Sequence, residues 1–190
     1  YDGIQFTLYD HARTPAMVSD NCVCLAEDDT GGLWVGTGDG LLCRKDRFWS
    51  RLTTHDGLCN NRVDSLCASG QGGLWIGTPS GLNRLRSGKM DAYVPRTPTL
   101  VTPTEIPPGN EVHQLAEDAA GRVWFSNGGG LQRFDPDTGL FTVVARHGLV
   151  HALAFDAAGQ LWWSDADDLH HLPAGQTTNW TTATPGKNNH

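Results

Sequence analysis

Two short clusters in this 190-residue sequence carry side chains that could hold a metal ion. Residues 135–139 (Asp-Pro-Asp-Thr-Gly) offer carboxylates of the kind found in calcium loops, and His170 and His171 are adjacent imidazoles, with His147 and His151 nearby. Calcium takes six or more oxygen ligands, and the first cluster has no bidentate Glu at the needed distance, so a turn is the simpler interpretation. Adjacent residues on a strand point to opposite faces, so the two histidines do not easily share one ion. We therefore predict neither a metal site nor a cofactor.

The sequence also lacks the common signatures of catalysis. It contains no nucleophile elbow and no HExxH, GxGxxG or Walker-type run. Its five cysteines include no CxxC pair. Cys22 and Cys24 would share one face of a strand, which is compatible with a metal or a disulfide, but small buried thiols are the commoner outcome. We expect this segment to have no catalytic activity of its own.

A fourfold repeat centred on a tryptophan supplies the elements that would position any site. The repeat recurs about every forty residues, a period typical of arrays of short strands. An Asp or Ser stands six residues before each tryptophan and a Gly three before it, which predicts a hairpin turn in each repeat. The four tryptophans are Trp34, Trp75, Trp124 and Trp162. We interpret the carboxylates at 27–29 and 117–118 as turn formers rather than catalytic groups.

Four antiparallel strands per repeat are the signature of a β-propeller blade. The predicted fold class is therefore all-β, a partial β-propeller of four four-stranded blades plus one outer strand of a preceding blade. The blades are expected at residues 22–54, 63–94, 112–144 and 150–182, with outer strands at 48–53, 90–94, 140–144 and 178–181, and the additional outer strand at 4–9. Residues 95–109 contain half of the chain's prolines and predict an extended loop, since proline cannot donate to a strand ladder.

Propeller topology gathers polar residues at one rim, where the loops that enter the inner strands meet those between second and third strands. By register these residues are Asp20, Asn21, Asp39, Asn61, Arg62, Ser80, Asn110, Glu111, His147 and Asp167. Their variety suits a small polar ligand, a peptide or a carbohydrate, because binding sites combine a few convergent polar groups with a concave wall. The same residues are equally consistent with turn formers on a solvated rim. The proline-rich loop is expected to overhang this rim.

Charge and hydropathy exclude other partners. A net charge of −7 leaves no broad basic surface for nucleic acid or an anionic membrane. The longest apolar runs are far too short to cross a bilayer, so we expect no membrane insertion of this segment. A strand pattern that begins at residue 4 predicts no signal peptide, and we interpret the chain as part of something longer. Open blade edges are expected to promote self-association.

The first two repeats resemble the two-component regulator propeller repeat. The resemblance rests on Leu-Ala-Glu-Asp-Asp-Thr-Gly-Gly-Leu-Trp-Val-Gly-Thr-Gly-Asp-Gly-Leu at 25–41, His-Asp-Gly-Leu at 55–58 and Cys-Asn-Asn-Arg-Val at 59–63. The third repeat is similar, whereas in the fourth Asp165 and Asp168 replace the Thr and Gly.

This resemblance implies part of a seven-bladed propeller in the extracytoplasmic, periplasmic sensor region of a bacterial histidine kinase, often a hybrid one. Such a module would sense a ligand or contact a partner, and pass the signal through a membrane helix to a kinase outside this chain. One alternative is a propeller lyase or hydrolase with a metal at the channel mouth, since similar blades occur in antibiotic-inactivating lyases. Another is a lectin-like or scaffold propeller that only binds.

Overall fold

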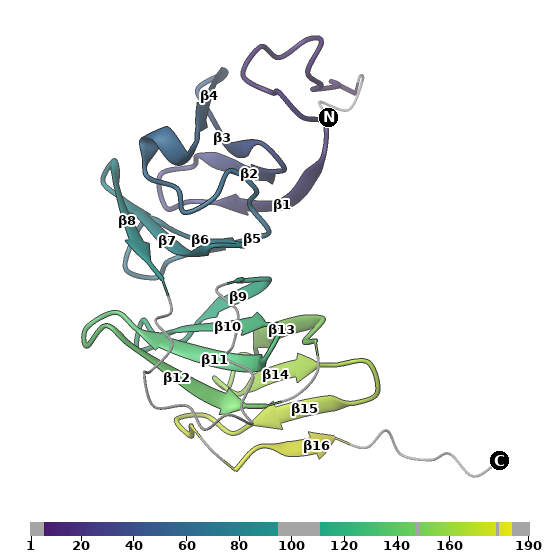
Figure 1. The fold of residues 1–190 in the computed structure, drawn as a ribbon, viewed down its shortest axis with the longest axis vertical. Coiled ribbons are helices and arrows are strands. Elements are labelled where there is room, and N and C mark those ends of the chain that lie inside the picture. Colours follow the sequence, from purple (N-terminus) through teal and green to yellow (C-terminus); the bar gives the residue numbers. More distant parts are fainter. Residues whose placement is uncertain (1–5, 95–110, 147–148, 178, 184–190) are drawn as a thin grey trace, which may run out of the picture.

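The computed structural model describes residues 6–94, 111–146, 149–177 and 179–183. Within these ranges the strands form four separate antiparallel sheets of four strands each. Figure 1 shows the sheets following one another along the chain, from the first in purple to the fourth in yellow. Each sheet is a simple meander, in which every strand pairs with the next in sequence. The predicted all-β partial propeller is confirmed.

The first two blades are joined by a short helical turn. In the first blade these are β1 (Cys22–Glu27), β2 (Leu33–Thr37), β3 (Gly40–Lys45) and β4 (Phe48–Leu52). A short 3-10 helix, η1 (Thr54–Asp56), follows, and Thr53 caps it in a capping box with Asp56. The second blade contains β5 (Ser65–Ala68), β6 (Leu74–Thr78), β7 (Gly81–Arg86) and β8 (Lys89–Tyr93).

The third and fourth blades repeat the pattern. The third contains β9 (Gln114–Glu117), β10 (Val123–Asn127), β11 (Gly130–Asp135) and β12 (Leu140–Ala145). The fourth contains β13 (Ala152–Phe155), β14 (Leu161–Ser164), β15 (Leu169–Leu172) and β16 (Thr181–Ala183). The inner strands of successive blades contact one another, β1 with β5, β5 with β9 and β9 with β13, which gives the propeller arrangement.

The predicted hairpin turns have the expected backbone. Gly31, Gly72, Gly121 and Gly159 have φ values of 79°, 84°, 80° and 77°. This is the left-handed region, where a residue with a Cβ would be strained. The amide of Gly31 donates to the carbonyl oxygen of Asp28 at 3.1 Å, and each later repeat has the same bond. The glycines of the repeat therefore serve turn geometry.

The apolar core lies in the seams between blades. The first seam buries Trp34 and Leu41 against Leu74 and Ile76, all at most 9% exposed. Corresponding clusters fill the seams between the second and third blades and between the third and fourth. A blade therefore depends on its neighbours for burial, as expected for repeat architectures.

Two predicted outer strands differ from the structure. Residues 6–9 form no strand, because no other described segment pairs with them; Tyr9 instead packs on the Trp49 ring at 5.4 Å between centroids. Residues 4 and 5 of that prediction lie outside the described residues. In the fourth blade the outer strand is Thr181–Ala183 rather than 178–181, since Asn179 has a φ of 66° and breaks the extended backbone. The proline-rich loop at 95–109 also lies outside the described residues.

Candidate functional site

The turns between second and third strands hold three of the predicted rim residues. Thr37 Oγ1 donates to the carbonyl of Gly40 at 2.9 Å and accepts the amide of Asp39 at 3.1 Å. In the second blade Thr78 makes the same pair of bonds and orders Ser80. In the later blades a carboxamide or carboxylate oxygen takes the place of the threonine hydroxyl. In the fourth blade Asp165 accepts the amide of Asp167 at 3.0 Å. Asp39, Ser80 and Asp167 therefore lie at equivalent places on one rim.

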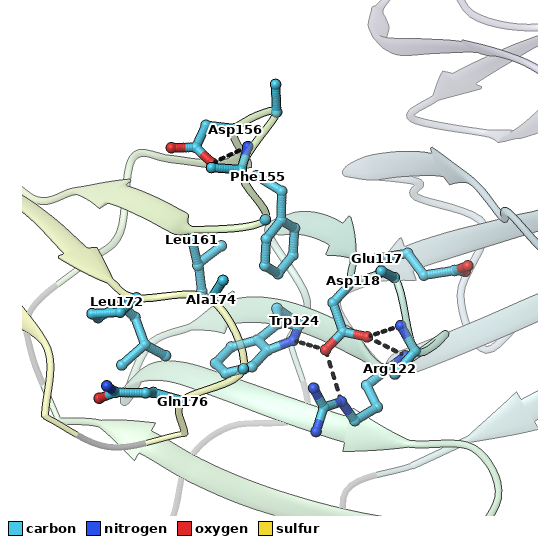
Figure 2. A pocket seen from close by; sticks show the side chains of 17 residues that line it. Glu117, Asp118, Arg122, Trp124, Phe155, Asp156, Leu161, Leu172, Ala174 and Gln176 are labelled. Atoms are coloured by element: carbon cyan, nitrogen blue, oxygen red, sulfur yellow. Dashed lines mark hydrogen bonds and ion pairs between the residues drawn. The ribbon is translucent and has the colours of Figure 1, made fainter.

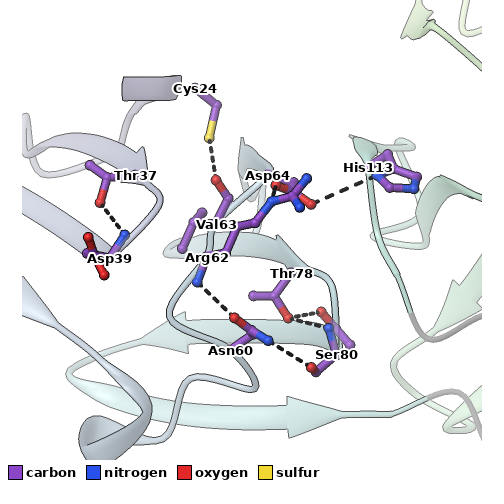
Figure 3. A network of polar contacts seen from close by, with 11 residues as sticks. Cys24, Thr37, Asp39, Asn60, Arg62, Val63, Asp64, Thr78, Ser80 and His113 are labelled. Carbon is purple, nitrogen blue, oxygen red and sulfur yellow. Dashed lines mark hydrogen bonds and ion pairs between the residues drawn. The ribbon is translucent and has the colours of Figure 1, made fainter. Parts of the chain in front are cut away.

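A polar network joins the turn between β6 and β7 to the loop that enters the second blade (Figure 3). Asn60 Nδ2 donates to Ser80 Oγ at 3.0 Å, and Asn60 Oδ1 accepts the amide of Arg62 at 2.9 Å. Arg62 Nε then donates to Asp64 Oδ1 at 2.7 Å. The other carboxylate oxygen of Asp64 lies 3.9 Å from Nδ1 of His113, which comes from the third blade. The structure thus brings Ser80 and Arg62 together with three residues that were not predicted.

Asp64 is the buried centre of this network. Its side chain is 7% exposed, and Oδ2 has no hydrogen-bond partner in the described structure. A buried charge needs compensation, which Arg62 supplies to one oxygen only. The Arg62 and His113 side chains are 60% and 31% exposed. Asp64 therefore orients the Arg62 guanidinium and lies near the His113 ring, so that two solvent-facing nitrogen-bearing groups stand beside one carboxylate. This arrangement suits a ligand with oxygen acceptors.

The other predicted rim residues that the structure describes do not join this network. Asp20 accepts the backbone amide of His11 at 2.7 Å, and this bond lowers the pKa of the Asp20 carboxyl, with a further bond from the His11 ring. Asn61 Oδ1 accepts the amide of Thr54 at 2.8 Å and so ties the η1 loop down. Asn21 is exposed and Glu111 is half-buried. Asn110 and His147 lie outside the described residues.

The opposite rim contains the hairpin carboxylates, which have a second task besides the turn. Asp28, Asp118 and Asp156 each accept the indole Nε1–H of their own repeat's tryptophan, at 2.7, 2.9 and 2.9 Å. The second blade has Ser69 at this position, and Trp75 donates instead to Glu117 of the third blade at 2.5 Å. These carboxylates therefore have a structural role, which is to hold the indole rings in place.

The electrostatics of Asp28 agree with this role. Partial burial opposes its ionisation, but hydrogen bonds from Trp34, Gly32 and Thr30 outweigh that effect and lower its pKa to about 2. The tryptophan faces are covered in turn by the third strand. The guanidinium of Arg84 lies 4.8 Å from the centroid of Trp75, and that of Arg133 lies 5.7 Å from Trp124. Such cation–π pairs fix the rings in the seam.

Two cavities open on this rim at the blade seams. One of about 470 Å³ lies between the third and fourth blades, where Trp124, Phe155 and Leu172 surround it (Figure 2). Its Arg122 Nε donates to Asp118 at 2.7 Å. The other, of about 570 Å³, lies between the first and second blades. Neither was predicted, because a cavity depends on how two distant segments fit together.

The clusters considered for metal binding have other contacts. Asp135 Oδ1 accepts the amides of Asp137 and Thr138, as in a turn. His170 contacts Asp165 and Thr182, whereas His171 contacts Thr181, so the adjacent histidines face different partners. Over the described ranges, no three His, Cys, Asp or Glu side chains are grouped to hold a metal ion.

The five cysteines are free thiols, and a bulge between Cys22 and Cys24 disturbs the register that would place them on one face. No described helix is long and apolar enough to span a membrane.

Three of the four repeats match a known family model. The family described as two component regulator propeller matches residues 17–39, 57–80 and 107–129, and leaves the fourth blade unmatched. No curated protein sequence matches the chain.

Several solved structures share the fold. The extracellular domain of a hybrid two component system from B. thetaiotaomicron aligns with a TM-score of 0.70 at 24% identity, over 89% of this chain and 23% of that one. A second such domain from the same organism aligns with a TM-score of 0.67 at 20% identity, over 83% of this chain and 22% of that one. Virginiamycin B lyase from Staphylococcus aureus aligns with a TM-score of 0.64 at 15% identity, over 88% and 57%. The chain thus spans under a quarter of the two sensor domains, and the likeness at these identities concerns the fold.

Proposed function

Because the chain carries repeats of the two component regulator propeller family, we propose that it is part of the extracytoplasmic input module of a two-component sensor histidine kinase. It would bind a small polar ligand and have no catalytic activity of its own. The extracellular sensor domains that share its fold support this placement. The kinase and the membrane helix would belong to the rest of the protein.

The Arg62–Asp64–His113 network is the observation that carries the proposal. It lies where a loop of the second blade meets the inner strand of the third, so a bound ligand would contact two blades at once. A ligand that binds better to one relative position of the blades would shift the population of that position. Binding at this seam could therefore be passed to the rest of the receptor.

A binding experiment tests the proposal. Citrate, glucuronate and glycylglycine would be titrated by calorimetry into the 190-residue chain and into an Arg62→Gln/His113→Gln variant. We expect at least one of these probes to bind the wild type and to bind the variant at least tenfold more weakly, since hydrogen bonds to charged groups contribute about 1.5–3 kcal/mol. Lys89→Gln, which removes an exposed charge from β8, is the matched control. Equal binding to wild type and variant would contradict this site.

The lyase alternative has one specific observation in its favour, the shared fold with virginiamycin B lyase. It would require a divalent ion held by histidine and acidic residues at the channel mouth. Metal analysis of the purified chain distinguishes the two functions, because a stoichiometric divalent ion would favour the lyase.

A further inference from the structure

The seam between the first two blades is open on the hairpin rim, whereas the next seam is closed at the corresponding place. In the closed seam, Glu117 accepts Trp75 Nε1–H at 2.5 Å and the Gly70 amide at 2.9 Å. Gln71 reaches across the same seam so closely that a Cβ on Gly121 would lie 2.4 Å from its Nε2. Two long side chains therefore fill this position.

The open seam has shorter side chains at the same two register positions. Ala68 stands where the third blade has Glu117, seven residues before the tryptophan, and Thr30 stands where the second blade has Gln71, four before it. Neither can bridge to the neighbouring blade as its counterpart does. Thr30 lines the cavity of about 570 Å³ between the two blades, and the volume of this cavity is within the range of small-molecule sites.

Four charged side chains of both signs line this cavity. Asp28 is held by hydrogen bonds from Thr30, Gly32 and Trp34, whereas the other three lack strong internal partners. Arg86 is exposed and has no hydrogen bond or ion pair within the described ranges. Among the residues that the structure describes, Lys45 Nζ donates only to Thr30 Oγ1, at 3.2 Å. Within the same part of the chain, the carboxylate of Asp29 accepts a single long bond, from the Gly73 amide at 3.4 Å.

The cavity at the third seam differs in this respect. There, the Asp118 side chain accepts four hydrogen bonds, including two from Arg122 and one from Trp124, so Asp118 and Arg122 are already paired with each other. The floor of the first-seam cavity is apolar and consists of Trp34, Leu52, Leu74 and Leu85. An apolar floor flanked by charges of opposite sign without ion-pair partners matches a ligand that has an apolar part, an ammonium group and a carboxylate.

We propose that the first-seam cavity binds a short apolar peptide in its zwitterionic form. The peptide's side chains would cover the apolar floor, its ammonium group would pair with Asp29, and its carboxylate would pair with Arg86 and Lys45. This site is on the rim opposite the Arg62–Asp64–His113 network and does not depend on the function proposed for that network. Guanidinium–carboxylate pairing favours Arg86 as the main carboxylate contact.

Titration of L-leucyl-L-leucine into the 190-residue chain by calorimetry or NMR tests the proposal. We expect saturable binding, weakened about fivefold or more when the peptide is N-acetylated or when its carboxylate is amidated. Asp29→Asn should remove the effect of acetylation, and Arg86→Gln should remove the effect of amidation, as in a double-mutant cycle. Asp29 and Arg86 are both exposed, so these variants are expected to fold.

Two further variants separate the cavity from general effects of charge and packing. Thr30→Gln places at the first seam the side chain that fills the second, and should abolish peptide binding. Lys89→Gln removes a cation from the same β7–β8 hairpin outside the cavity and should bind as wild type does. Absence of leucyl-leucine binding to wild type, or equal binding of the charged and the blocked peptides, would overturn the proposal. Arg62→Gln should leave this binding unchanged, which keeps the two sites distinguishable.

Discussion

Replacing Trp75 with alanine should lower the free energy of unfolding by about 3–5 kcal/mol, the usual cost of truncating a fully buried aromatic residue. Trp75 is 0% exposed in the seam between the second and third blades. Its ring lies 5.9 Å from that of Tyr93 and 6.1 Å from that of Phe134, between centroids. Alanine would leave a cavity that these rings can fill only in part.

A second component is the indole hydrogen bond across the seam. Trp75 Nε1 donates to Glu117 at 2.5 Å, and a hydrogen bond to a charged group contributes about 1.5–3 kcal/mol when its partner would otherwise be left unsatisfied. Trp75→Phe keeps most of the buried ring and removes only this donor. We therefore expect Trp75→Phe to cost about 1–3 kcal/mol, less than Trp75→Ala.

Urea denaturation followed by far-UV circular dichroism measures both changes, because the free energy of unfolding falls linearly with urea concentration. Trp49 is the matched control, since it is only half-buried on the outer strand β4, and Trp49→Ala should cost about 1 kcal/mol. A cost of Trp75→Ala no larger than that of Trp49→Ala would refute the assignment of this ring to the seam core. A neutral Trp75→Phe would refute a stabilising role for the bond to Glu117.

Acid should destabilise the chain between about pH 4 and pH 2 through Asp28. The folded pKa of Asp28, about 2, lies below the ordinary value of 3.8, so its contribution to stability is complete above pH 3.8 and is lost as the pH falls. Urea titrations at pH 2 to 5 should show a smaller loss of stability for Asp28→Asn than for wild type. Burial raises the pKa of Cys24 to about 12, so iodoacetamide at pH 7.5 should alkylate exposed Cys22 first and Cys24 only under unfolding conditions, as peptide mass mapping would reveal. We also expect self-association through the open first blade, where Leu25 is 65% exposed on β1. Leu25→Lys should lower the mass measured by light scattering, and a wild type that is already monomeric at high concentration would contradict this expectation.

The fold could be predicted because its strongest signals are local. A tryptophan, an Asp or Ser six residues earlier and a glycine three residues earlier specify a turn and the strand that follows it. The prediction was wrong where that local pattern weakens. The outer strand of the fourth blade begins at Thr181 because Asn179 adopts a left-handed backbone. Residues 6–9 alternate like a strand, but pairing also requires a neighbouring strand.

The candidate site was only partly accessible from the sequence. Arg62 and Ser80 were predicted as rim residues, whereas Asp64 and His113 were missed. Both missed residues stand eleven positions before a tryptophan, a position held by Val23 and His151 in the other two repeats. A comparison of that register position would have revealed three ionisable groups, each directly before an inner strand. The contact between them still depends on how the blades pack, which the sequence does not state locally.

The open and closed seams show how one scaffold can present different sites. The residue seven positions before the tryptophan is Ala68, Glu117 or Phe155 in successive blades, and it changes from a small side chain to a cross-seam acceptor to an aromatic wall. The strand pairing around it is the same in all three blades. Because the ladder tolerates these exchanges, the shape and charge of a seam can vary without loss of the fold. Binding differences among the blades are therefore encoded at a few register positions. The tryptophan and the turn preserve the strand framework on which those positions lie.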